Sequence, residues 1–276
     1  MKLSELQFDK NYAICVVGDA GSGKTTLAGT APGKKYFFCF EDGLTSIAHD
    51  KQALETVEFD LYLPKPHLPL ARTPVEKQRA GDYPGKSWEL ATAKLRELSK
   101  NCPYDVVIVD SLSSMSQVNF EAILAELDLL GKPPKADSRT AYQTLGLQSL
   151  QFFHGVLGLP CAKIMIGHET YERDETTGRL QYKISAEGNM FSSRVSTGRD
   201  FGEIWRTTST STAEKGRIFS VQTQSTDKFP AKSRWGCFAA AELPNINKMM
   251  EKVYKKFGKP GEVVSSSKSV AAERQQ

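Results

Sequence analysis

The chain has 276 residues, of which 39% are hydrophobic and 25% are charged, with a formal net charge of +4 at pH 7. This length allows one sizeable hydrophobic core, and so mild a charge does not by itself indicate a nucleic-acid partner. The sequence shows neither an apolar run of membrane-spanning length nor a signal-peptide pattern near its start, so we expect a cytoplasmic protein without membrane contact. Its five cysteines are scattered and form no C-x-x-C pair, which favours reduced structural thiols over metal ligands.

The first predicted element is a buried strand over Tyr12–Val17, which leads into a glycine-rich turn and then a helix. The turn, GDAGSGKTT, satisfies the pattern G-x-x-x-x-G-K-[ST] in the strand–loop–helix setting that gives this pattern its meaning. Because glycines lack Cβ, the backbone N–H groups of such a loop can approach phosphate oxygens closely. We therefore predict a nucleotide-binding P-loop, with Lys24 on the β- and γ-phosphates of ATP and Thr25 on Mg²⁺. Its residues are Gly18, Asp19, Ala20, Gly21, Ser22, Gly23, Lys24, Thr25 and Thr26.

The next part of the chain alternates apolar segments with helical ones. Five prolines between Pro64 and Lys86 predict an irregular surface excursion, for which a solvated loop is favoured over a binding role. Ser87 is a suitable N-cap for the helix that follows, and Cys102-Pro103 ends that helix. The other predicted elements are a strand over 35–40, a short helix around 44–54, a strand over 57–63 and a strand over 104–110.

Three predicted strands end in polar side chains at the edge where the carboxyl ends of parallel strands meet a ligand. Asp110 follows the apolar run VVIV, and we expect it to be a second contact to Mg²⁺. Glu41, which ends the strand over 35–40, is favoured over Asp42 as the acid that polarises the attacking water. The alternative for Glu41 is a helix-capping or solvated role. His168 ends a later strand, where a hydrogen-bonding side chain can sense the γ-phosphate.

The second half of the chain predicts helices over 115–130 and 138–157, with Tyr142 among the core candidates of the second helix. The remaining elements are a strand over 162–167, a polar hairpin over 169–185, a second hairpin from 201–208 and 217–224, a helix that opens at Asn245, and a disordered tail over 258–276. The order of elements predicts an α/β fold, with a mainly parallel central sheet flanked by helices and antiparallel strands and hairpins toward the C-terminus, in a single domain over 1–257.

The segment VIVDSLSSM, residues 107–115, resembles the V-V-D-S segment of the bacterial recombinase RecA and its relatives. The order of motifs, from an N-terminal P-loop through E-D-G and D-S to K-S-R, resembles the core-only, RecA-like ATPases that bacteriophages encode for single-strand annealing or recombination. The resemblance covers residues 10–257 and implies an ATP hydrolase, located in the bacterial host cytosol if phage-encoded. It implies that Glu41 is the catalytic base and that His168, where RecA has Gln, is the γ-phosphate sensor.

The stretch AKSRWG, residues 231–236, is similar to the K-N-R-F-G motif of RadA-type relatives of RecA. This similarity implies that Lys232 and Arg234 are catalytic residues that act on the nucleotide of a neighbouring subunit. It therefore implies a homo-oligomer with shared ATP sites, in the form of a ring or a filament. Single-strand-binding proteins and other recombination proteins are further possible partners under the same resemblance.

The resemblance also implies that the segments over 113–139 and 169–199 face single-stranded DNA. In the second segment aromatic residues lie among basic ones, which suits stacking on bases and contact with phosphates. The alternative is an exposed hairpin whose aromatic side chains pack on the domain. The candidate DNA-binding residues are Tyr171, Arg173, Arg179, Tyr182, Lys183, Arg194 and Arg199.

The preferred function is thus a DNA-stimulated ATPase in recombination or strand annealing, and two other functions stay open. The first is a small-molecule or nucleoside kinase, which needs an arginine-rich lid; the excursion over 64–86 offers only Arg72 and Arg79 for it. The second is a nucleotide-gated adaptor in replication or helicase loading, which binds ATP without hydrolysing it.

Overall fold

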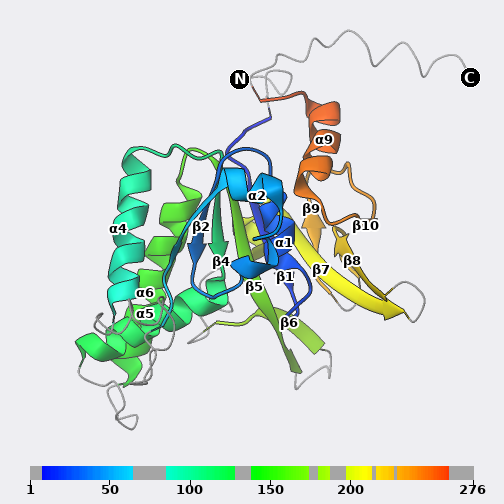
Figure 1. The fold of residues 1–276 in the computed structure, drawn as a ribbon. Helices are drawn as coiled ribbons and strands as arrows, with labels where there is room; N and C mark the ends of the chain where they lie inside the picture. The colour runs from blue at the N-terminus through cyan, green and yellow to red at the C-terminus, as the bar shows by residue number, and fades with distance from the viewer. Residues whose placement is uncertain are drawn as a thin grey trace, which may run out of the picture.

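The computed structural model describes residues 8–64, 85–127, 138–173, 180–186, 197–212, 216–226 and 229–260. Helices and strands alternate from β1 to β5, and antiparallel strands follow (Figure 1). The elements are β1 (Ala13–Gly18), α1 (Lys24–Gly29), β2 (Lys35–Cys39), the 3₁₀ turn η2 (Leu44–Ser46), α2 (Lys51–Thr56), β3 (Val57–Leu61), α4 (Lys86–Lys100), β4 (Val106–Asp110), α5 (Leu112–Glu126), α6 (Ser138–Leu157), β5 (Ala162–Arg173), β6 (Leu180–Ile184), α8 (Thr197–Asp200), β7 (Glu203–Thr212), β8 (Gly216–Gln222), β9 (Lys232–Ser233), β10 (Ala241–Glu242) and α9 (Ile246–Phe257).

A mostly parallel sheet forms the centre of the molecule. Its strands lie in the order β10-β8-β7-β1-β5-β4-β2-β3, with β6 paired to β5 and β9 paired to β7. The strands from β7 to β3 run parallel to one another, whereas β8, β10, β9 and β6 pair antiparallel with their neighbours. Every residue of β2 and β4 is buried, as expected for parallel strands that are covered on both faces. The predicted fold class is therefore confirmed.

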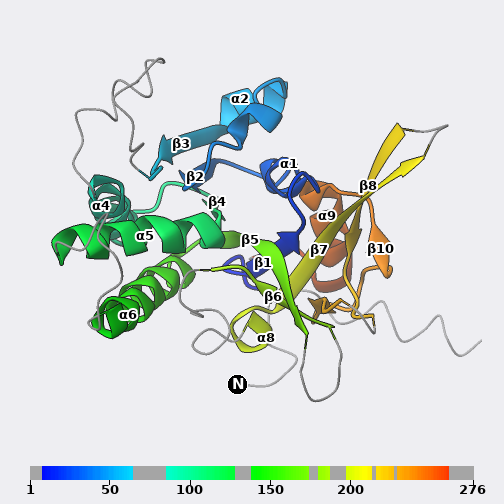
Figure 2. The same cartoon turned by 90° about the horizontal axis from the view of Figure 1, so that it is seen from below.

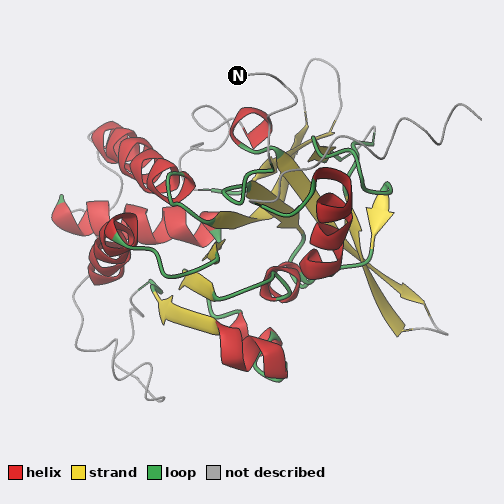
Figure 3. Cartoon of the chain, turned by 90° about the horizontal axis from the view of Figure 1, so that it is seen from above, coloured by secondary structure: helices red, strands yellow, loops and turns green. Residues whose placement is uncertain are grey.

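Helices cover both faces of this sheet (Figure 2, Figure 3). On one face α4, α5 and α6 pack against the strands through buried side chains such as Leu98, Met115 and Phe153. On the other face α1, α2 and α9 do the same, with Leu27 and Met250 among the buried residues. Each such side chain stabilises the fold by about 1.5–3 kcal/mol on burial. The two layers hold the strands in fixed register and so position the loops at the carboxyl edge of the sheet.

Polar side chains cap the starts of α9 and α5. The Asn245 side chain accepts the N–H of Lys248 at 3.0 Å and caps α9, as predicted. The Ser111 hydroxyl accepts the N–H of Ser114 at 3.2 Å and caps α5 in the same way. Because of this cap, α5 begins three residues before the predicted start at Met115. The cap thus brings the first turn of α5 directly against the end of β4.

The predicted start of α4 was wrong by two residues. The helix begins at Lys86, after Gly85 turns the chain with a left-handed φ of 91°. Ser87 therefore lies inside the helix, and its hydroxyl donates to the carbonyl of Leu63 at 2.6 Å instead of capping. The predicted apolar face of this helix is confirmed, since its four members are buried: Trp88, Ala91, Leu95 and Leu98.

Two further details differ from the prediction. The helix expected around 44–54 is divided into the turn η2 and the separate helix α2, which Asp50 caps. Tyr142 was predicted to be in the core but is 44% exposed. Its ring stacks on Phe120 of α5, with ring centroids 4.9 Å apart, so the side chain covers the outer side of the α5–α6 contact.

Two hairpins extend from the sheet beyond its carboxyl edge, β5–β6 at the bottom of Figure 1 and β7–β8 on its right. The predicted hairpin over 169–185 is confirmed, but its first arm is the continuation of β5, which runs past Gly167 to Arg173 because its distal half pairs with β6. The second hairpin is formed by β7 and β8, and its first strand begins at Glu203 rather than at 201. Both hairpins are therefore direct outgrowths of strands that flank β1.

Some predictions lie outside the described residues. They concern most of the excursion over 64–86, the helix end at 128–130, the turn at 213–215 and the tail beyond residue 260. The single-domain boundary at 257 stays a prediction. Within the described ranges, no helix combines the length and the apolarity that a membrane crossing requires.

Candidate nucleotide-binding site

The predicted P-loop joins β1 to α1 at the carboxyl edge of the sheet. Gly21 and Gly23 have φ values of 69° and 88°, in the left-handed region that glycine adopts without strain. Lys24 is the first residue of α1, and its Nζ donates to the carbonyls of Gly18 at 2.9 Å and Asp19 at 2.8 Å. The loop therefore brings the N–H groups at the start of the helix and one ammonium group around the same turn, which is an arrangement suited to an anion.

Lys24 is buried among negative charges. Lys24 is only 6% exposed, and this burial lowers the pKa of its ammonium group. The charges of neighbouring carboxylates act in the opposite direction and favour the ammonium form. The contributing carboxylates belong to Glu41, Asp110, Glu169 and Asp19.

Asp110 ends β4 beside the start of α1. Thr25 Oγ1 donates to Asp110 Oδ2 at 2.7 Å, while Asp110 Oδ1 is buried and has no hydrogen-bond partner within the described residues. Burial raises the pKa of Asp110 to about 7 against the effect of the Thr25 hydrogen bond, and the charge of Glu41 adds to the rise. Hydroxyl and carboxylate oxygens are ligands that Mg²⁺ prefers, and this ion commonly takes its other ligands from phosphates and water. The pair, with its orphaned Oδ1, therefore fits Mg²⁺.

A metal bound by protein side chains alone does not fit this edge. No group of three or more His, Cys, Asp and Glu residues in the described part of the chain is arranged to hold a metal ion. The residues at this edge allow a metal ion to take two oxygen ligands from the chain. Its other ligands then come from a nucleotide and water.

Glu41 and His168 form a second polar pair at the same edge. Both carboxylate oxygens of Glu41 lie 3.0 Å from His168 Nε2, and Ser114 Oγ donates to Oε2 at 3.2 Å. Burial acts to raise the pKa of Glu41, but the hydrogen bond and charge of His168 outweigh it and lower the pKa to about 2. Asp42 is exposed, whereas Glu41 also interacts with Asp110. Of the two adjacent acids, the structure brings Glu41 into the cluster.

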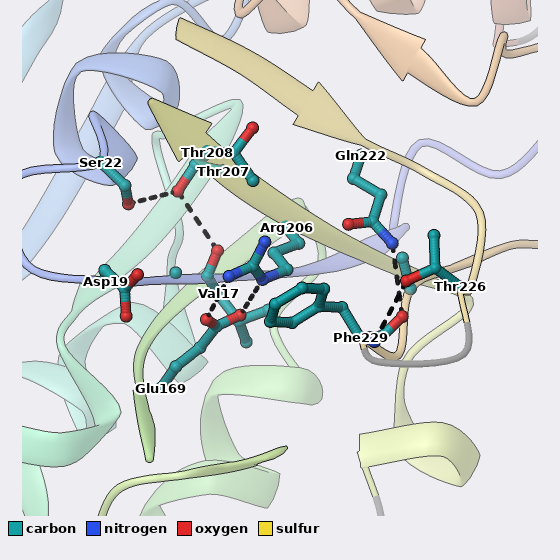
Figure 4. Close-up of polar contacts among 12 residues, drawn as sticks. Val17, Asp19, Ser22, Glu169, Arg206, Thr207, Thr208, Gln222, Thr226 and Phe229 are labelled. Carbon is teal, nitrogen blue, oxygen red and sulfur yellow. Dashed lines mark hydrogen bonds and ion pairs between the residues drawn. The ribbon is translucent and has the colours of Figure 1, made fainter. Parts of the chain in front are cut away.

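Two hydroxyl groups that the sequence did not single out complete this edge. Ser113, in the first turn of α5, accepts the backbone N–H of His168 at 3.1 Å. Thr207 of β7 shares a 2.7 Å hydrogen bond with Ser22 of the P-loop and donates to the carbonyl of Val17 at 3.2 Å (Figure 4). Ser113 could have been found from the sequence, because several serines follow Asp110 at the end of its strand. Thr207 could not, because it comes from a strand far along the chain.

A buried ion pair also lies at this edge and was missed by the sequence analysis. Arg206 donates from Nε to Glu169 Oε1 at 2.6 Å and from Nη2 to Oε2 at 2.9 Å, and its guanidinium lies 3.5 Å from the ring centroid of Phe229 (Figure 4). The two charged side chains are only 9% and 5% exposed. Arg206 is in register with Val17 of β1, and Glu169 directly follows His168. The pair thus joins the base of the β5–β6 hairpin to the strand beside the P-loop.

Lys232 and Arg234 lie at the opposite edge of the sheet. Their short strand β9 pairs with the start of β7, where Ser233 opposes Glu203. Glu203 is in turn in register with Ile14, near the beginning of β1, whereas the P-loop follows the end of β1. Arg234 is exposed. The structure therefore does not bring these residues to the P-loop of their own chain, and their action on a neighbouring subunit stays a prediction.

The described DNA-binding candidates lie on or near the β5–β6 hairpin. Tyr171 is 67% exposed, and its ring centroid lies 6.0 Å from that of Tyr182, which in turn lies 4.4 Å from that of Phe229. Tyr182 therefore packs toward the domain, while Tyr171 faces outward. Arg173 is exposed, and Arg199 is held in an ion pair within α8. The candidates outside the described residues are Arg179, Arg194 and the side chain of Lys183.

Comparison with families of known proteins matches residues 10–235 to a family described as an AAA domain. The chain belongs to this family. It is therefore a P-loop ATPase domain that binds ATP, and the match extends from just before β1 to just beyond β9. A search of curated proteins finds no match. Membership of the AAA family thus agrees with the P-loop at the carboxyl edge of the sheet. The finer resemblance to phage-encoded RecA-like ATPases stays a prediction.

Proposed function

We propose that this AAA domain hydrolyses ATP with Mg²⁺ in the manner of RecA and acts on single-stranded DNA in phage-type recombination or strand annealing. The observation that carries the proposal is the convergence of five side chains at one edge, from the start of α1, the segment just after β2, the end of β4 and the middle of β5. They belong to Lys24, Thr25, Asp110, Glu41 and His168. A phosphate-binding loop, two metal-binding oxygens, an acid and a hydrogen-bonding sensor are the parts that ATP hydrolysis requires.

In this proposal each residue has a defined task. Lys24 and the N–H groups of the loop bind the phosphates, and Thr25 and ionised Asp110 hold Mg²⁺, which neutralises phosphate charge when bound. Glu41 is ionised at neutral pH because its pKa lies near 2, so it can orient the attacking water through a hydrogen bond. His168, which is hydrogen-bonded to Glu41, links the position of that acid to the γ-phosphate.

The position of Lys232 and Arg234 supports hydrolysis that depends on assembly. Both lie at the edge opposite the P-loop, and the exposed Arg234 is free to reach another copy of the chain. We therefore propose that they act on the neighbour's nucleotide, where such cationic side chains contribute about 10³–10⁵-fold in rate. Mixing inactive Lys24→Ala and Arg234→Ala proteins should recover part of the ATPase activity, because some interfaces then combine two intact halves. Absence of recovery at every mixing ratio, in stably assembled oligomers, contradicts a shared site.

The continuity of β5 supports a connection between ATP and DNA. This strand carries His168 at the sheet edge and continues without interruption into the hairpin that exposes Tyr171. Tyr171→Ala should weaken binding of single-stranded DNA by about 1–3 kcal/mol, the value of one stacked base, and should leave the unfolding free energy unchanged. The matched control is Tyr142→Ala, which removes an exposed tyrosine from α6. Equal DNA affinity of the two variants in a fluorescence-anisotropy titration contradicts a DNA-binding hairpin.

One set of measurements separates this function from its alternatives. The ATPase rate and the particle size are compared with and without single-stranded DNA, in the absence of any phosphate acceptor. We expect DNA to raise both, and Glu41→Gln to retain ATP binding while turnover falls by about 10²–10⁴-fold. Turnover that requires a small-molecule acceptor identifies a kinase instead. DNA-dependent assembly that follows ATP binding without hydrolysis identifies an adaptor.

A further inference from the structure

The β7–β8 hairpin passes directly beside the P-loop, next to α1 in Figure 2. A Cβ built on Gly23 would lie 3.2 Å from the ring of Phe219, and one built on Gly21 would lie 3.4 Å from Nη2 of Arg217. Phe219 and Arg217 are two residues apart on β8 and therefore share one face of the strand, while Ile218 between them is on the other. The face of β8 that carries Arg217 and Phe219 therefore lies against the phosphate-binding loop.

The guanidinium of Arg217 places hydrogen-bond donors beside the phosphate-binding loop. A guanidinium carries five N–H donors, and in the structure Nη2 donates to Ser209 Oγ at 3.0 Å. The guanidinium also lies 5.1 Å from the ring centroid of Phe219, which holds it along the strand. Neither a hydroxyl nor a ring neutralises its charge, and the side chain is exposed. Arg217 is therefore a positioned cation beside an anion-binding loop.

The charge balance at this edge calls for such a cation. Four carboxylates act on Lys24 before any nucleotide is considered. The other buried cation near the loop, Arg206, is neutralised by its bidentate contact with Glu169. Because Arg206 and Glu169 offset each other, three carboxylates and the phosphates of ATP remain, and Lys24 and the Mg²⁺ proposed above offset this negative charge only in part. A guanidinium is well suited to reduce this repulsion, because its planar fork forms two charge-assisted hydrogen bonds to one phosphate.

We propose that Arg217 binds the phosphates of the nucleotide that is held by the P-loop of its own chain. The inference rests on the nucleotide site proposed above and adds to it a cation supplied by the antiparallel hairpin of the same subunit. It differs from the role of Lys232 and Arg234, which lie at the far edge of the sheet and need a neighbouring subunit. The β7–β8 hairpin is then part of the nucleotide site.

The test is calorimetric titration of the full chain with ATP, ADP and adenosine. Arg217→Ala should raise the Kd for ATP and ADP about tenfold and leave that for adenosine unchanged, because only the phosphates are contacted. Arg217→Lys should recover part of the affinity, since it keeps the charge and loses the fork. The matched control is Ile218→Ala, on the opposite face of the same strand, which should bind all three ligands as the unaltered chain does. The difference between Arg217→Ala and the unaltered chain should shrink as salt is raised.

Each other outcome is decisive. If the unaltered chain binds ATP and Arg217→Ala binds it equally well, the inference is overturned while the proposed nucleotide site stands. If the unaltered chain binds no ATP, the proposed site itself fails. A loss of affinity that Ile218→Ala shares, together with a lower melting temperature in both variants, shows a structural role for the hairpin and also overturns the inference. So does normal ATP binding by Arg217→Ala combined with weaker binding of single-stranded DNA.

Discussion

A buried lysine contacts the backbone near each end of helix α1, Lys24 as its first residue and Lys35 as the first residue of β2, and the two look alike in burial and hydrogen bonding. Lys24 at the first residue is 6% exposed, and Lys35, which lies beyond the last turn, is 0% exposed. Each Nζ donates to two backbone carbonyls. Burial lowers the pKa of both ammonium groups. Burial and hydrogen bonding therefore do not tell which lysine binds a ligand.

The difference lies in what each end of the helix presents. Lys35 donates to Ala31 and Gly33 in the turn after α1, where carbonyl oxygens are in excess, so a cation satisfies them. Lys163 does the same after α6, donating to the carbonyl of Leu159 at 3.2 Å. Lys24 instead lies where backbone N–H donors are in excess, and it adds positive charge to them. Such a lysine completes a site for an anion, whereas the other two complete the fold.

The largest expected effect tests how charge is balanced at the phosphate edge. Arg206→Ala leaves Glu169 buried without its partner, which should lower the unfolding free energy by about 3–5 kcal/mol in urea titrations. The control is Arg199→Ala, whose ion pair involves a side chain that is 71% exposed and should contribute about 1 kcal/mol or less. Similar losses in the two variants would mean that burial of the Arg206 pair has no energetic consequence.

A pH titration of stability tests the same edge. Because burial raises the pKa of Asp110 from 3.8 to about 7, the folded chain keeps a proton that the unfolded chain releases between these values. The unfolding free energy without nucleotide should therefore fall as pH rises across this window, by up to about 4 kcal/mol. Glu41 acts in the opposite sense below pH 4.5, where stability is lost as pH falls toward 2. In Asp110→Asn the decline between pH 4 and 7 should be absent; parallel pH profiles for the two proteins would refute the assignment.

The comparison of the two lysines is tested most directly at Lys24, which starts α1 at the P-loop. Lys24→Ala removes the ammonium group from the phosphates and should lower ATP turnover by about 10²–10³-fold, the size of loss seen when one oriented donor to a transition state is removed. The carbonyls of Gly18 and Asp19 also lose their donor, so the unfolding free energy should fall, and turnover is therefore compared per folded molecule. Turnover within a few-fold of the unaltered chain would remove Lys24 from the site.

The smallest effect is expected at the other end of α1. Lys35→Met leaves the carbonyls of Ala31 and Gly33 without their donor, which should cost about 1–3 kcal/mol of unfolding free energy. ATP turnover per folded molecule should not change, because this lysine lies at the edge away from the P-loop. A turnover defect in folded Lys35→Met protein would show that the two ends of the helix are not functionally separate.

Much of the candidate site could be predicted because its signals are local. Lys24 and Thr25 belong to one continuous pattern, and Asp110, Glu41 and His168 each come after an apolar run of residues. Parallel strands bring such ends to one edge whatever their order in the sheet. The same reasoning could not find that Glu169 and Arg206 pair, because they are 37 residues apart on strands that flank β1 from opposite sides. It also failed where a contact from another segment decided the position of a side chain. Tyr142 stacks on Phe120 at the surface, and Ser87 donates to the carbonyl of Leu63 instead of capping its helix.

Residue patterns were enough to predict the phosphate-binding loop, the alternation of strands and helices, and the polar side chains that come after apolar runs. These follow from residue types and from periods of a few residues, which hold wherever the segment lies in the fold. That β7 lies beside β1, and that Thr207, Arg206 and one face of β8 therefore border the P-loop, became known from the folded chain. Strand order depends on pairing between distant segments, and no short pattern within either segment names its partner.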